Sequence, residues 1–257
     1  MTLSQYYALI DVQARMALKS DASRYYFGYL WWVLEPLLYV GVFYVVFNVI
    51  LDSRRSDFLI FLVCGKLPFV WFSKSVSQAS SSIIANVGLI GKIDVTKTLF
   101  PMAVIQEGLY KQAVVFLLLF AILLFTGYMP TMAWFWLIPI MLVNYIMIVA
   151  CSYVGAVLVC YMRDFTIFIG LGMIFLMFTS GIFWDLRALE PAMAEAVLLY
   201  NPMALILDSY RQVLMQNAAP DLVHLAWVGA LFGGLTIIMV KLMRFLSKSL
   251  ALKALTA

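Results

Sequence analysis

The residues of this chain that could do chemistry are a few charged side chains inside long apolar stretches. Glu107 and Lys111 are four residues apart with the acid first, the favourable order for an ion pair on a helix. Lys66 and Lys74 are eight apart in another stretch, on nearly the same helix face. A charge in lipid is costly, so each is a candidate functional residue. We interpret Glu107 and Lys111 as a structural ion pair, with a wet interior as the alternative. For the two lysines a water-filled cavity and snorkelling toward the interfaces both stay open.

Sites of covalent chemistry are missing from the sequence. Gly91-Lys92 is the nearest approach to a phosphate-binding P-loop, but Ile93 follows where Ser or Thr is needed. The single histidine, His224, cannot build a metal site alone, and the three cysteines lack the spacing of a disulfide framework or a zinc site. The sequence therefore predicts no catalytic residue, no metal and no cofactor in this chain.

The composition explains why these charges stand out. Of the 257 residues, 65% are hydrophobic and 12% are charged, against about 45–50% and about 25% in a soluble domain. A small globule has too little interior to hide that much apolar surface from water. A soluble enzyme, a secreted disulfide scaffold and a disordered chain are therefore excluded. We expect an all-α polytopic membrane protein without a nucleic-acid partner.

Residues 1–257 are expected to form a single transmembrane domain. Residues 3–19 place apolar side chains on one helix face and polar ones opposite, which predicts an amphipathic helix on the membrane surface. A soluble helix packed on loops is the alternative. Longer apolar stretches predict six transmembrane helices, at about 30–51, 57–84, 103–126, 133–160, 165–184 and 222–244.

Residues 185–221 are too charged to cross the membrane in one pass and too apolar for a free loop. They predict two short re-entrant or surface helices, about 190–199 and 203–216, separated at Asn201-Pro202, because proline disfavours helix in the preceding residue. With the N-terminus inside, the inner segments hold ten Lys or Arg and the outer segments four. This excess places both termini in the cytoplasm.

Aromatic side chains follow helix faces in the first two predicted spans. Tyr39, Phe43 and Phe47 recur every four residues, and Phe69 and Phe72 follow the proline of the second span. Such stripes usually contact lipid or pack between helices. The functional alternative is a stacking surface for sugar rings.

Five segments carry a further signal through their order and spacing: Arg24 with FGYLWWVLEPLL (27–38), GKLPFVWFSKSVSQASSSIIANVGLI (65–90), Glu107, Arg163-Asp164 and YNPMALILDSYRQVLM (200–215). Together they resemble the ABC-2 type permeases, the six-span membrane subunits of ABC exporters. The closest match is the branch that exports capsular polysaccharide and O-antigen.

The resemblance implies a permease homodimer in the bacterial inner membrane, with twelve spans around a central path. It implies two copies of a separate cytoplasmic ATPase that binds ATP and magnesium. The substrate would be a long polysaccharide, usually lipid-linked, moved to the periplasm. The alternatives are an exporter of teichoic acid, a smaller lipid or a drug, a membrane-embedded transferase acting on a lipid carrier, and a structural scaffold.

Within this family we assign three groups of residues as hypotheses. The substrate path would be lined by Tyr39, Phe43, Phe47, Phe69, Phe72 and Lys74. The contact with the ATPase would use Asn86, Lys92, Asp94, Lys97, Arg15 and Lys19. The outer gate would be formed by Asn201, Pro202, Asp208 and Arg211.

Overall fold

The computed structural model describes residues 2–46, 57–92 and 95–256, which are helices joined by loops, without a strand in these ranges. Four helices are long and apolar enough to cross a membrane. They are α3 (Phe58–Ser80), α6 (Leu99–Phe125), α7 (Leu137–Tyr161, continuing the 3-10 helix η3, Met132–Trp136) and α11 (Leu222–Phe245). The all-helical membrane class is thus confirmed.

The described residues contain four long apolar helices, fewer than the six spans that the sequence predicts. The helices α1 (Leu3–Arg24) and α2 (Trp31–Tyr44) pass the test for a span together, but the chain bends by 99° between them. The stretch predicted as the fifth span is the apolar helix α8 (Phe165–Thr179), of 15 residues. At about 1.5 Å per residue such a helix is shorter than a bilayer core of about 30 Å. The described residues therefore hold four candidate spans, or five if the bent pair is one span, and six stays a prediction.

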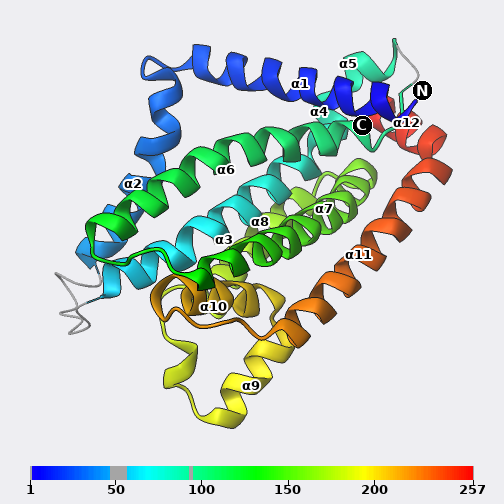
Figure 1. Cartoon of the computed structure of the whole chain (residues 1–257). Helices are drawn as coiled ribbons and strands as arrows, with labels where there is room; N and C mark the ends of the chain where they lie inside the picture. The colour runs from blue at the N-terminus through cyan, green and yellow to red at the C-terminus, as the bar shows by residue number, and fades with distance from the viewer. Residues whose placement is uncertain (1, 47–56, 93–94, 257) are drawn as a thin grey trace.

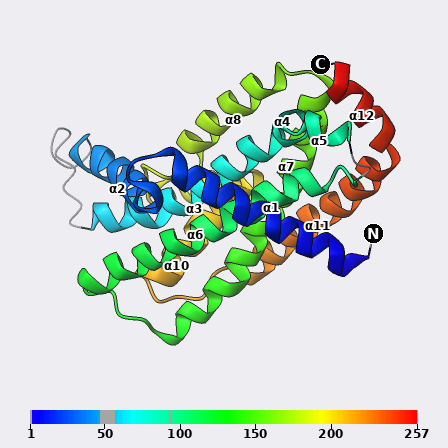
Figure 2. The same ribbon diagram turned by 90° about the horizontal axis from the view of Figure 1, so that it is seen from above.

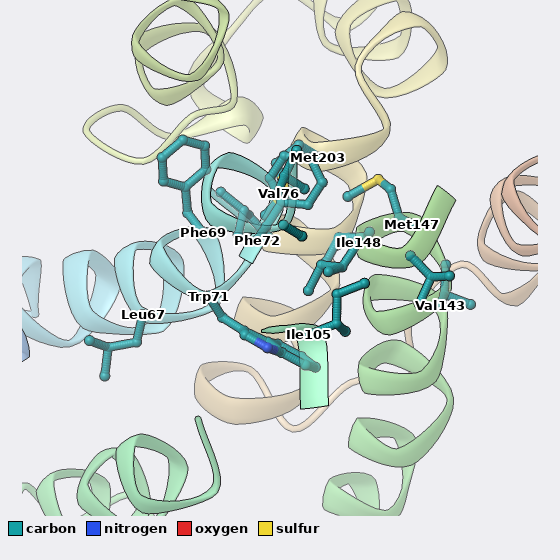
Figure 3. Close-up of a cluster of buried hydrophobic side chains, with 14 of the residues drawn as sticks. Leu67, Phe69, Trp71, Phe72, Val76, Ile105, Val143, Met147, Ile148 and Met203 are labelled. Atoms are coloured by element: carbon teal, nitrogen blue, oxygen red, sulfur yellow. The ribbon is translucent and has the colours of Figure 1, made fainter. Parts of the chain in front are cut away.

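Helix α3 lies at the centre of the molecule, with α6, α7 and the short helix α10 (Pro202–Met215) packed around it (Figure 1). In the most apolar part of α3, 78% of the residues are buried, whereas in that of α11 only 11% are buried. The buried side chains of α3 form one core with those of α7 and α10 (Figure 3). Lys66 of α3, which is 5% exposed, is therefore surrounded by protein.

The N-terminal helix α1 extends to Arg24, five residues beyond the predicted end at 19. It starts with a capping box, in which the Thr2 hydroxyl and the Gln5 side chain each accept a hydrogen bond from the other residue's backbone N–H. Its end is followed by an elbow where Gly28 has a φ of +50°, a conformation that glycine adopts without strain. The short 3-10 helix η1 (Gly28–Leu30) then leads into α2. Figure 2 shows α1 crossing over the bundle.

The two ends of the bundle carry different short helices. At one end α9 (Pro191–Tyr200) is followed by α10, with the break at Asn201 where the sequence predicts it. At the other end lie α4 (Ser82–Ala85), α5 (Val87–Ile90) and α12 (Ser247–Thr256), the last of which the sequence reading missed. Both chain termini lie at this second end (Figure 1).

Candidate functional site

Lys66 of α3 is surrounded by aromatic rings. Its side chain is 5% exposed, and its Nζ lies 4.9 Å from the ring centroid of Phe43, 5.7 Å from that of Phe69 and 5.8 Å from that of Tyr39. The sulfur of Met177 on α8 is 3.0 Å from the same nitrogen. Within the described ranges no carboxylate lies at ion-pair distance from Lys66. Cation–π attraction, worth about 2 kcal/mol or more in a desolvated site, thus replaces an ion pair here.

The predicted path residues divide into three groups. Tyr39, Phe43 and Phe69 meet around Lys66, although they come from two helices. Phe72 is 3% exposed in the core, and Figure 3 shows it among core side chains. Phe47 lies outside the described residues. Among the described aromatic residues of this set, only Tyr39 is exposed, at 45% in the single chain.

Lys74 and Lys111, unlike Lys66, are paired with carboxylates. The Nζ of Lys74 lies 2.5 Å from a carboxylate oxygen of Glu35 on α2. Lys111 forms the predicted pair with Glu107 at 2.8 Å and a second ion pair with Asp21 of α1 at 2.7 Å. The two lysines left open in the sequence therefore differ, since Lys66 contacts rings and Lys74 a carboxylate. We had missed Glu35, although the rule that singled out Lys66 applies equally to an acid in an apolar stretch.

The predicted gate residues hold α10 in place. Asn201 caps this helix by accepting hydrogen bonds from the backbone N–H groups of Met203 and Ala204, both at 3.1 Å. Pro202 occupies the first turn, where its missing N–H costs nothing. Asp208 is 7% exposed and lies 3.6 Å from the Arg187 side chain.

Arg211 is the most enclosed of these residues. Its guanidinium donates to the backbone carbonyls of Phe61 at 3.2 Å, Gly181 at 2.7 Å and Ile182 at 3.1 Å. It also lies 3.5 Å from the centroid of the Phe61 ring. The sequence analysis counts Arg211 among the charges outside the membrane, yet it is 3% exposed. Its hydrogen bonds join α10 to α3 and to the segment after α8.

The residues predicted to contact the ATPase lie along one end of the molecule. Lys92 is exposed, and Lys92, Lys97 and Lys248 of α12 line one concavity of about 300 Å³. Most of Lys97 is buried, and its ammonium donates to the Val95 carbonyl at 3.1 Å. The side-chain amide of Asn86 donates a hydrogen bond to the Ser82 carbonyl. Asn86 is also the residue that precedes α5. Asp94 lies outside the described residues.

The two predicted contact residues of α1 have different surroundings. Arg15 forms an ion pair at 2.9 Å with Asp11, whose carboxylate also accepts a hydrogen bond from Tyr110 of α6. Lys19 is exposed. Helix α1 is therefore fastened to α6 through Asp11 and Asp21, while Arg15 and Lys19 face outward.

Comparison with known proteins finds relatives of one function class. No family model matches the chain. The chain is 27% identical over 217 residues to an O-antigen export system permease protein RfbA of Klebsiella pneumoniae, covering 84% of this chain and 83% of that protein. It is 24% identical over 220 residues to the RfbA permease protein of Myxococcus xanthus, covering 85% of each. The resemblance to ABC-2 type polysaccharide export permeases is confirmed.

A second kind of relative agrees with this class. The chain is 26% identical over 106 residues to the polysialic acid transport protein KpsM of Escherichia coli, covering 40% of this chain and 41% of that protein. The exporters of teichoic acid, small lipids or drugs, and the transferase, are not favoured by these relatives. The relatives are transport permease subunits, and in this chain the Lys66 cluster lies between α2, α3 and α8.

Proposed function

We propose that this chain is the permease of an ATP-driven exporter that moves an O-antigen or capsular polysaccharide, carried on a lipid, across the bacterial inner membrane. The observation that carries the proposal is the similarity to O-antigen export permeases over most of both chains. The chain itself would bind no cofactor. ATP and magnesium would be bound by two copies of a cytoplasmic ATPase.

The proposed working form is a homodimer with the path between the two copies. Helix α8 supports this, because its described residues include no fully buried one and it exposes large apolar side chains such as Phe168, Phe175 and Phe178. Helix α2 has a similar exposed side, which includes Tyr39. A second copy or lipid would cover these faces, and the Lys66 cluster lies directly behind them.

In the proposed path, aromatic side chains contact the sugar rings, and these contacts are exchanged as the polysaccharide moves. A polysaccharide must slide, so many weak contacts serve better than one tight site. Stacking on an aromatic ring provides about 1–3 kcal/mol per unit without demanding one hydrogen-bond pattern, by analogy with nucleic-acid bases. We assign Tyr39 and Phe43 to this role, with Lys66 behind them as a cation that faces no carboxylate within the described residues.

The proposed contact with the ATPase lies at the opposite end from α9 and α10. The concavity between α5 and α12 is lined by Lys92, Lys97 and Lys248, so it suits an acidic surface. Helix α1 would lie beside it, with Arg15 and Lys19 outward. Movement of the ATPase would then reach α6 through the bonds of Asp11 and Asp21, and would bias the permease between closed and open dimers.

An export assay tests the function and the path together. The gene is deleted, and surface polysaccharide is measured after complementation with wild type or with Tyr39→Ala, Phe43→Ala. We expect the double variant to lower surface polysaccharide at least about fivefold, since two stacking contacts are lost. Phe72 is left intact because truncating a buried ring costs about 3–5 kcal/mol of stability.

Matched controls separate the path from general damage. Trp227 and Phe245 on α11 are 71% and 86% exposed, and Trp227→Ala, Phe245→Ala should keep export at the wild-type level. If the deletion strain keeps its surface polysaccharide, the proposed function is wrong. If the Tyr39 and Phe43 variant exports normally while the deletion strain does not, only the aromatic path is wrong.

A further inference from the structure

A cavity of about 270 Å³ lies at the elbow of the chain, where α1 and α2 meet α3 and α6. It is separate from the Lys66 cluster, and the functions proposed above place no ligand in it, although they use the Asp21–Lys111 bond in its wall. Its walls include Trp31 and Trp32 at the start of α2 and Lys74 of α3. Pockets for small ligands usually measure about 300–1,000 Å³, so this one suits a single ring-sized unit.

The walls of the cavity hold polar groups that lack partners. Trp71, Ser75 and Gln112 all line it and are 3%, 2% and 4% exposed. Within the described ranges the indole Nε1, the hydroxyl Oγ and the amide Nε2 of these residues have no hydrogen-bond partner. Buried polar groups are nearly always satisfied, and these three atoms lie just behind the cavity wall. A ligand with acceptor oxygens would bind them once their side chains rotate toward the cavity. All three are neutral groups that can donate.

The charges of the cavity do not call for an anion. Four charged residues line it, and they form two ion pairs: Lys74 with Glu35 at 2.5 Å and Lys111 with Asp21 at 2.7 Å. Each cation already faces a carboxylate, and the four formal charges cancel. The carboxylates retain lone pairs that can accept hydrogen bonds from hydroxyl groups. The best ligand is thus neutral and carries both hydroxyl donors and oxygen acceptors.

The aromatic rings of Trp31 and Trp32 lie beside these polar groups, and both already have neighbours. Trp31 stacks with Tyr25 at a centroid distance of 6.3 Å, and the Nζ of Lys111 lies 5.7 Å from the Trp32 ring centroid. A sugar ring has C–H faces that fit aromatic rings and a rim of hydroxyl groups. We propose that this cavity binds one neutral sugar residue. This proposal rests on the proposed function, because the sugar residue would be a unit of the transported glycan.

Binding is tested with the purified full-length permease in detergent and the methyl glycosides of mannose, glucose, galactose and N-acetylglucosamine as probes. Saturation-transfer NMR reports which glycoside contacts the protein, and its titration gives the dissociation constant. We expect at least one glycoside to bind wild type in the millimolar range. Ser75→Ala should weaken that binding about fivefold, and Gln112→Leu should abolish it at the same concentrations.

A matched control separates the cavity from the effect of a buried hydroxyl. Ser152 of α7 is also fully buried with no partner for its Oγ within the described ranges, but it does not line the cavity. Ser152→Ala should bind the glycoside like wild type. Ser75→Ala, Gln112→Leu and Ser152→Ala should all keep or raise the thermal unfolding temperature, because each removes an unsatisfied polar group. A variant that unfolds is thereby distinguished from one that loses the ligand.

Two outcomes would overturn the site. One is the absence of binding by wild type to all four glycosides, which would leave water as the occupant. The other is equal binding by wild type, Ser75→Ala and Gln112→Leu, which would place the sugar elsewhere. Neither outcome depends on export, because the deletion strain tests the proposed function on its own. Glycoside binding in a protein whose deletion leaves surface polysaccharide intact would keep the site and reject its assigned substrate.

Discussion

Arg211 illustrates at the residue scale how a charge can be kept inside this fold. Its guanidinium donates to three backbone carbonyls and lies on the Phe61 ring, so these groups share the work of replacing its hydration. Space for the guanidinium comes from Gly65, one turn along α3 from Phe61. A Cβ at position 65 would stand 2.4 Å from Nη2 of Arg211. The missing side chain of one residue therefore makes room for the charged side chain of another.

Gly65→Ala should lower the free energy of unfolding by about 1–3 kcal/mol, as overpacking of a filled interior usually does. The added methyl group displaces the guanidinium from its carbonyls. Gly234→Ala is the control, since a Cβ there meets nothing within 4 Å and alanine favours the helix. Thermal unfolding in detergent measures both variants. Equal unfolding temperatures for the two would show that Arg211 moves aside at no cost.

Helix α10 shows at the element scale why residues 185–221 were hard to classify. It has charged and polar side chains, yet eleven of its fourteen residues are buried. Burial is possible because Asn201 satisfies its first N–H groups, and because Arg211 and Asp208 find partners inside the protein. Its bounds differ by one residue at each end from the predicted 203–216. A gating role for α10 stays a prediction.

Asn201→Ala should destabilise the permease by about 1 kcal/mol, because it removes the cap of α10. The amide of Asn201 also donates to the Ser180 hydroxyl at 3.1 Å, which ties α10 to the end of α8. Asn201→Asp keeps the capping oxygen and loses this donor, so its unfolding temperature should lie between those of wild type and Asn201→Ala. If Asn201→Asp is as unstable as Asn201→Ala, the bond to Ser180 and not the cap is what matters.

At the scale of the whole molecule the two ends differ in their charges and helices. Lys92, Lys97 and Lys248 gather at the end that holds both termini, while α9 and α10 lie at the other. This arrangement agrees with the excess of Lys and Arg in the segments predicted to face the cytoplasm. The termini are therefore on one side of the molecule, and we predict that this side is cytoplasmic.

Cysteine labelling in whole cells tests the orientation. In a background without the three native cysteines, Ala188→Cys should react with a membrane-impermeant maleimide added outside. Lys92→Cys and Lys248→Cys should react only after the membrane is broken. All three positions are exposed in the single chain, so failure to react reports sidedness rather than burial. Labelling of position 92 in intact cells would reverse the orientation.

The sequence by itself determined the features that depend on neighbours along the chain. Apolar stretches predicted α3, α6, α7 and α11 to within a few residues, because the lipid requires a continuous apolar helix. The Asn201-Pro202 break and the Glu107–Lys111 pair followed from spacing alone, since both are local. The end of α1, the short α8 and the helix α12 did not follow, because caps and packing set those limits.

Only the tertiary structure decided which distant groups meet. Glu35 faces Lys74 from another helix, and Lys66 lies against rings of α2 and the sulfur of Met177. Helical periodicity places each residue on a face of its own helix but does not say which face of which helix packs against it. That choice is made by the packing of all side chains at once. The elbow cavity has the same origin, since its walls come from four helices that no local pattern brings together.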